Sequence, residues 1–171
     1  PWPRETLRQW RRAYEIETAE ELKGSDWMQA LIQDGAKKIQ AACELSEEAC
    51  ALLSQPGGPY MYAEVLEKDQ EILREMRRAT DLDSLVRIFS GLSFPRLSGK
   101  KDAQVDPQLR EQVKGLREQY KGIVKDLKED YFSKDLQEIL AEIRVCRVPV
   151  RALLDLTETF MDSYGARKRE K

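Results

Sequence analysis

A row of basic side chains is the feature of this sequence with the clearest capacity for chemistry. Its six members follow one another at spacings of four, three, four, four and three residues: Arg110, Lys114, Arg117, Lys121, Lys125 and Lys128. Residues three or four apart share one face of a helix, so these cations would form a stripe. Such a stripe can bind the phosphates of a nucleic acid through charge alone, without reading its bases.

More cations precede the stripe, in a segment where Gly91, Pro95 and Gly99 predict a loop. We predict phosphate contacts at six positions in the loop and the stripe: Arg96, Lys100, Lys101, Lys114, Arg117 and Lys121. A second interpretation stays open. Each basic residue of the stripe follows an apolar position, so the stripe borders a buried seam, and its cations can pair with acids at helical spacing. The acids in reach are Glu111, Glu118, Asp126 and Glu129.

The residues that enzymes use for acid-base, nucleophilic or metal chemistry are sparse. The chain has no histidine, which is the commonest general base and transition-metal ligand. Gly57 and Gly58 lack the Lys-Ser/Thr pair that completes a phosphate-binding loop. Asp69 lies beside an apolar stripe, which favours a buried hydrogen-bonding partner or a boundary residue over a catalytic acid. We therefore predict no catalytic residue, metal or cofactor in this chain. A helical enzyme with a carboxylate metal site is a rival hypothesis that metal analysis would test.

Composition limits the possible partners. The 29 Lys and Arg residues nearly balance the 31 Asp and Glu residues, for a net charge of -2. This balance argues against a strongly basic nucleic-acid module but not against a local basic face. No apolar run approaches the ~18 residues of a membrane span, so we predict no membrane contact. Cys43, Cys50 and Cys146 fit buried thiols in a reducing compartment. The start at Pro1, without an initiator Met, predicts a piece of a longer protein.

The elements that must position these residues are helices. Apolar residues recur with helical period nearly everywhere, and the sequence of Gln55–Pro59 gives the clearest break. We predict an all-α fold, an irregular bundle of five to seven helices that forms one subdomain over 1–171. The predicted helices span about 4–17, 25–54, 60–79, 81–90, 106–132, 134–147 and 150–169, with a loop at 91–105. The last break rests on Pro149, which cannot donate a backbone hydrogen bond.

Large apolar residues near the two ends continue the apolar stripes, and tryptophans at helical spacing are typical of core or docking residues. Trp10 and Trp27 lie on the apolar sides of the first two helices, and Leu153, Leu156 and Phe160 continue the stripe of the last. A competing hypothesis makes the chain a protein-interaction scaffold without a nucleic-acid role. It predicts an exposed apolar patch on the order of several hundred Å², for which the region of Trp2 and Trp10 is the candidate.

Three strings resemble AddA, the helicase/nuclease subunit of the bacterial AddAB complex, which is related to RecB. They are Ser93-Phe94-Pro95-Arg96-Leu97, then Asp106-Pro107 with Val113-Lys114-Gly115-Leu116-Arg117, and then Lys125 to Phe132. The resemblance covers most of the chain and is strongest from about residue 59 onward. It implies the helical 1B insertion subdomain of a UvrD-like superfamily-1 helicase.

The resemblance carries further implications for function. Such a subdomain has no ATPase motif and helps to hold DNA at the motor during double-strand-break processing and recombinational repair. The parent protein would be an ATP-dependent DNA helicase and exonuclease of the bacterial cytoplasm that uses ATP and Mg²⁺. Its partners would be DNA, as duplex or fork, and an AddB-like subunit.

Overall fold

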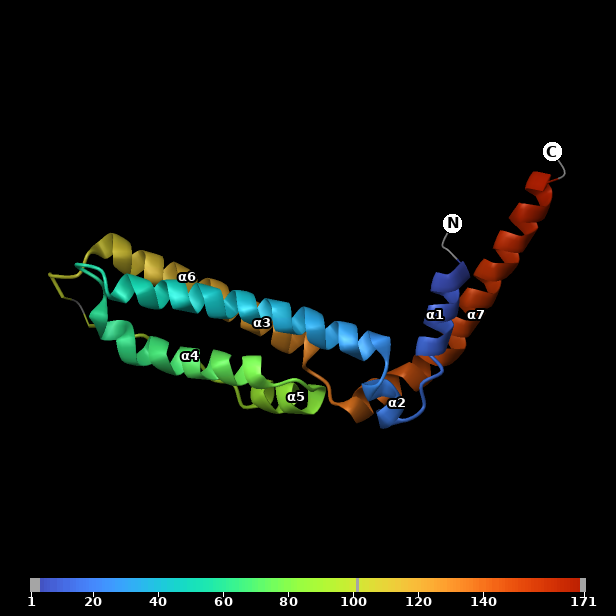
Figure 1. Cartoon of the computed structure of the whole chain (residues 1–171), viewed down its shortest axis with the longest axis horizontal. Coiled ribbons are helices and arrows are strands. Elements are labelled where there is room, and N and C mark those ends of the chain that lie inside the picture. Colours follow the sequence, from blue (N-terminus) through green and yellow to red (C-terminus); the bar gives the residue numbers. More distant parts are fainter. Residues whose placement is uncertain (1–3, 101, 170–171) are drawn as a thin grey trace. The chain divides into compact units, whose positions relative to one another are not determined.

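The computed structural model describes residues 4–100 and 102–169, and in these ranges every regular element is helical (Figure 1). The predicted all-α fold is therefore confirmed. The α-helices are α1 (Arg4–Ala13), α2 (Ala19–Lys23), α3 (Asp26–Leu53), α4 (Ala63–Arg78), α5 (Leu82–Ser90), α6 (Pro107–Asp126) and α7 (Leu136–Arg169). A 3-10 turn, η1 (Tyr60–Tyr62), precedes α4, and a π-helical turn, η2 (Leu127–Tyr131), follows α6. The predicted roles of Trp2 and Lys101 fall outside the described residues.

The chain divides into two compact units, where the sequence suggested one subdomain. Unit 1 combines the chain up to Gln29 with the chain from Leu136 onward, and unit 2 is Ala30–Asp135. Unit 1 therefore contains α1, α2, the first turn of α3 and α7. Unit 2 contains the rest of α3 and all of α4, α5 and α6 with both short turns.

Local capping signals explain most helix boundaries. Asp106 accepts a hydrogen bond from the N–H of Gln108 at 2.7 Å, and Pro107 occupies the first position of α6, where its missing N–H has no cost. Asp81 caps α5 by accepting from the N–H of Ser84 at 2.8 Å. Gly57 has a φ of 79°, in the left-handed region that glycine tolerates. The predicted breaks at these places are present.

The first helix is shorter than predicted and a second one follows it. α1 ends at Ala13, and the carbonyls of Tyr14 and Ile16 accept hydrogen bonds from Arg147 at 2.8 and 3.0 Å instead of continuing a helix. α2 then begins with a capping box, because Thr18 accepts from the N–H of Glu21 at 3.2 Å and the Glu21 carboxylate accepts from the N–H of Thr18 at 3.3 Å. The Thr-x-x-Glu pattern was readable in the sequence.

The last helix runs through Pro149, whereas the sequence suggested two helices, 134–147 and 150–169. A proline removes one backbone donor, and the carbonyl left without its partner is that of Val145. Val145 is 77% exposed, so water can satisfy this carbonyl. Leu140 and Leu154 are buried on either side of the proline and hold both parts of α7 against the unit.

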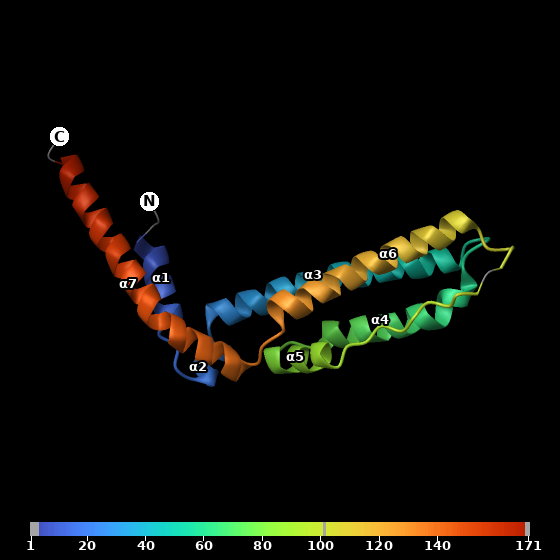
Figure 2. The same ribbon diagram turned by 180° about the vertical axis from the view of Figure 1, so that it is seen from behind.

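Unit 2 is built around three helices. α3 runs antiparallel to α4 and α6, as the course of the chain in Figures 1 and 2 shows. Its core includes a cluster of buried residues from these helices and η1: Ala49, Tyr62, Leu66 and Val113. Phe132 stacks on Phe89 with ring centroids 5.1 Å apart, and its ring packs against Gly35 of α3. A Cβ at position 35 would lie 2.5 Å from the Phe132 ring, so only glycine permits this approach.

In unit 1, α1 lies against α7 in antiparallel orientation, side by side in both views (Figures 1 and 2). Leu7 and Leu154 are buried there. Arg11 pairs with Asp155 at 2.7 Å and with Glu158 at 3.0 Å, which adds polar contacts along the edge of the apolar seam. Across residues 4–100 and 102–169, none of the helices has the length and apolar character that a bilayer crossing needs.

Candidate functional site

Arg117, a member of the predicted phosphate-binding set, is buried inside unit 2. It is 4% exposed, and its Nε and Nη2 donate to the two carboxylate oxygens of Asp69 at 2.7 and 3.3 Å. Nη2 also donates to the carbonyl of Pro95 at 2.6 Å. A guanidinium that is enclosed and already shared between two acceptors cannot reach a phosphate at the surface. The predicted phosphate contact by Arg117 is therefore not compatible with this geometry.

Asp69 is a buried hydrogen-bonding partner, as its place beside an apolar stripe predicted. It is fully buried and accepts hydrogen bonds from Arg117 and, at 2.6 Å, from the hydroxyl of Tyr120. A buried carboxylate is stable only when it is paired and hydrogen-bonded. We call these three residues, Asp69, Arg117 and Tyr120, the buried triad.

Two members of the buried triad, Arg117 and Tyr120, stay protonated over a wide pH range. Burial and the hydrogen bond to Asp69 raise the pKa of the Tyr120 hydroxyl, so it stays a donor. Burial by itself lowers the pKa of Arg117, but the hydrogen bond and the charge of Asp69 outweigh this effect and raise it overall. Both side chains therefore keep donating to Asp69.

Lys114 and Lys121 flank Arg117 one helical turn before and after it, and both are partly exposed. Lys114 pairs with Glu111 at 2.7 Å, and Lys121 pairs with Glu118 at 3.1 Å. These are two of the acid pairs that the solvated-face interpretation predicted. Exposed pairs of this kind stabilise a protein by only ~0–1 kcal/mol and are screened by salt. Each lysine can therefore exchange its carboxylate for a phosphate at little cost.

The loop at 91–105 carries the other predicted cations, and it is anchored to unit 2. Leu97 packs on the core cluster, and the ring of Phe94 lies 6.2 Å from that of Tyr120. Arg96 and Lys100 are exposed, and the Lys100 Nζ lies 5.9 Å from the centroid of the Tyr60 ring. Of the six predicted contacts, four are thus surface cations of unit 2: Arg96, Lys100, Lys114 and Lys121.

Other reactive groups are dispersed. Among the described residues, no three His, Cys, Asp or Glu side chains converge as a metal site would require. Cys43 is buried and Cys50 is partly buried, and burial raises the pKa of both thiols. Cys146 is exposed, which corrects the expectation of three buried thiols.

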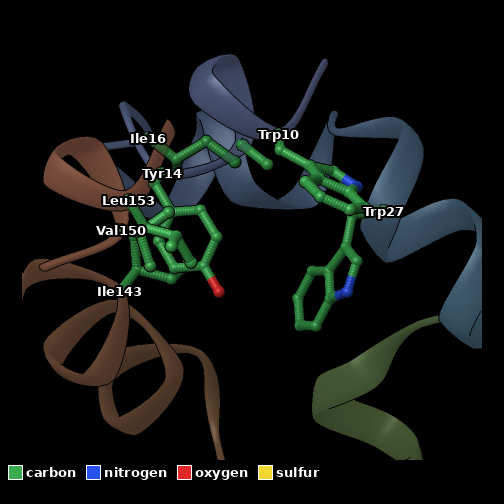
Figure 3. A pocket seen from close by; sticks show the side chains of 8 residues that line it. Trp10, Tyr14, Ile16, Trp27, Ile143, Val150 and Leu153 are labelled. Atoms are coloured by element: carbon green, nitrogen blue, oxygen red, sulfur yellow. The ribbon is translucent and has the colours of Figure 1, made fainter. Parts of the chain in front are cut away.

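Unit 1 contains an apolar groove that the sequence did not predict. Its volume is about 430 Å³, and Figure 3 shows Trp10 and Trp27 on one side of it, with Tyr14, Ile143 and Val150 on the other. The full lining is Trp10, Ala13, Tyr14, Ile16, Trp27, Ile143, Val150 and Leu153. Trp10 is 41% exposed and Trp27 is 47% exposed, so both line this open groove and neither is enclosed in a core.

One face of α7 extends this apolar surface. Six large apolar side chains of α7 are each 62–77% exposed: Val145, Val148, Leu153, Leu156, Phe160 and Tyr164. The last four follow one another at spacings of three and four residues, so they share one face of the helix. The predicted apolar stripe of Leu153, Leu154, Leu156 and Phe160 is thus divided, because Leu154 is buried and the other three are exposed. An exposed apolar face of this kind is typical of a surface that docks another protein element. We call the groove and this face of α7 the apolar docking face.

Comparison with known proteins gives a consistent match. No protein-family model matches the sequence. The A subunit of the ATP-dependent helicase/nuclease of Lachnoclostridium phytofermentans is 31% identical over 99% of this chain, which corresponds to 13% of that protein. Proteins of the same name from Oceanobacillus iheyensis and Geobacillus kaustophilus are 29% and 30% identical, each over 100% of this chain and 14% of their own length. The chain thus spans about 14% of the curated relatives it matches.

Proposed function

We propose that this chain, which is homologous over its whole length to one segment of ATP-dependent helicase/nuclease A subunits of the AddA type, is a DNA-holding helical part of such a protein. It corresponds in this proposal to the helical 1B insertion of the motor and carries no catalytic residue itself. ATP hydrolysis, Mg²⁺ binding and DNA cleavage would take place elsewhere in the parent protein. The parent would process double-strand breaks in the bacterial cytoplasm, together with an AddB-like subunit.

The observation that carries the DNA-holding role is the arrangement of exposed cations on unit 2. The Pro95 carbonyl accepts a hydrogen bond from Arg117, so the neighbouring Arg96 lies on a segment of the loop that is attached to α6, the helix that also carries Lys114 and Lys121. Lys100 extends the group along the same loop. The proposed phosphate contacts are thus Arg96, Lys100, Lys114 and Lys121, with Lys101 next to them in sequence. Contacts of this type position a duplex and are independent of its sequence.

A salt titration of DNA binding tests this proposal. In a full-length AddA-type protein that carries this segment, R96A/K100A/K114A/K121A should lower the slope of log affinity against log salt by about 3 to 4 for duplex DNA, because each phosphate contact contributes ~0.9. A matched control removes four exposed cations elsewhere: Arg8, Arg12, Lys37 and Arg78. The control should leave the slope unchanged. Equal slopes in both variants and the parent would contradict the proposed contacts.

A second candidate function has its own observation. The apolar docking face fits the scaffold hypothesis, in which unit 1 binds another protein surface, either elsewhere in the same protein or on a partner. In that case L156E/F160E should weaken the association of the full-length protein with its partner, or lower its thermal stability, while the salt slope stays the same. The control, Q9E/Q29E, adds the same charge to unit 1 at two exposed polar positions outside the apolar docking face. Equal effects of the two variants would argue against a specific docking role.

A further inference from the structure

The described residues of the loop, 91–100 and 102–105, form no helix or strand, so the anchors of the loop decide where its cations lie. Residues 94 and 95 both attach to α6 through the buried triad. The Pro95 carbonyl accepts from Arg117 at 2.6 Å, and the Phe94 ring packs near Tyr120. Arg96 is the next residue along the chain. Arg96, one exposed cation of the loop, is thus the residue next to a contact with a buried group.

The chemistry of Arg117 suits this connecting role. A guanidinium has five N–H donors in a fixed plane. Two of its nitrogens bind the Asp69 carboxylate, which sets the orientation of that plane. One of these nitrogens, Nη2, is then aimed at the Pro95 carbonyl, 22 residues earlier in the chain. A lysine at this position has one nitrogen and no plane, so it could not hold both partners in the same geometry.

Helical spacing places surface cations on both sides of this anchor. Lys114 precedes Arg117 by three residues and Lys121 follows it by four, so the three share a face of α6. The loop meets α6 at the buried Arg117 side chain. Arg96, the next residue after this contact, is exposed.

We infer that Arg117 is a positioning residue for phosphate binding: Asp69 and Tyr120 orient it, and its hydrogen bond to Pro95 holds the loop so that Arg96 contacts a phosphate. This inference rests on the proposed DNA-holding function. It assigns to Arg117, which the sequence alone places among the phosphate ligands, an indirect role. Loss of the buried triad should weaken phosphate binding although no exposed cation is removed.

The test uses a variant that removes the buried triad without changing net charge. D69L/R117M/Y120F deletes one negative and one positive charge and leaves no buried polar side chain of the triad without a partner. Such apolar replacements of buried ion pairs often preserve the fold. In the full-length AddA-type protein, this variant should lower the salt slope of duplex binding by about 0.9, as R96A should. Adding R96A to the triple variant should lower it no further, because Arg96 is already displaced.

Two other variants guard against a purely structural explanation. R117K keeps the charge and an ion pair with Asp69 but loses the planar hold on Pro95, so it should lower the slope like R96A. Leu73→Ala creates a cavity at a buried position of α4 that is not among the loop's anchors, and it should leave the slope unchanged. Limited trypsin digestion should cut after Arg96 and Lys100 faster in R117K than in the wild type or in Leu73→Ala.

The outcomes separate this inference from the function on which it rests. If R96A lowers the slope but neither R117K nor the triple variant does so, Arg117 does not position the loop and the inference is overturned. If the reductions in salt slope caused by the triple variant and by R96A are additive when the two are combined, Arg117 acts independently of Arg96 and the inference also fails. If R96A, K114A and K121A all leave the slope unchanged, the proposed function itself is refuted.

Discussion

Removal of Arg117 alone should destabilise unit 2 far more than removal of an exposed cation one turn away. R117M leaves the Asp69 carboxylate fully buried without its counter-charge. Breaking a buried ion pair in this way costs about 3–5 kcal/mol. For a domain of ~100 residues, each kcal/mol lowers the melting temperature by ~4–8 °C, so a fall of at least ~12 °C is expected. K114A breaks an exposed pair and should cost no more than ~1 kcal/mol.

Thermal and urea unfolding of the chain, followed by circular dichroism, measures both effects. D69L/R117M/Y120F should recover most of the stability lost in R117M, because it removes the unpaired carboxylate together with its donors. A cost of R117M no larger than that of K114A would refute the assignment of a desolvated ion pair. So would a triple variant less stable than R117M.

Two more predictions concern stability. G35A should lower the free energy of unfolding in urea by ~1–3 kcal/mol, because a Cβ there meets the Phe132 ring at 2.5 Å. G122A has open space around it, so it should be neutral or stabilise the protein by up to ~1 kcal/mol. The free energy of unfolding should fall above about pH 10, the ordinary pKa of tyrosine. Tyr120 ionises there in the unfolded chain, whereas its raised pKa keeps it protonated in the folded one. Y120F should show a smaller fall in the same pH titration.

The helical framework was predictable because its signals are local. Apolar periodicity, the Asp106 cap and the glycine turn at Gly57 each act within a few residues. The errors arose where distant contacts decide. The first helix ends before Tyr14 because the Tyr14 carbonyl accepts a hydrogen bond from Arg147, 133 residues away. Pro149 stays within α7 because packing on both sides supports the helix.

The separation of Arg117 from the surface cations could not be predicted from spacing alone. All members of the basic stripe share the same helical periodicity, and only the partner distinguishes Arg117. That partner, Asp69, is 48 residues away. One signal did exist, since Asp69 lies beside an apolar stripe and Arg117 borders another, and two opposite charges on facing seams can pair.

The exposure of the apolar residues in unit 1 could not be predicted from the sequence either. Periodicity shows which side of a helix is apolar, but it does not show whether another element covers that side. Leu154 is buried against the unit, whereas its neighbour Leu153 and the later Phe160 are exposed. The same pattern therefore serves a core and the apolar docking face.

The central claim is that the exposed cations of unit 2 contact DNA phosphates, and site-specific photocrosslinking tests it most directly. A photoreactive amino acid is placed at one position at a time in the full-length AddA-type protein, which is then irradiated on a forked duplex. Positions 96, 114 and 121 should crosslink to DNA, whereas the exposed control positions 12 and 78 should not. Crosslinks that are absent at all three positions, or as frequent at the controls, would contradict the claim.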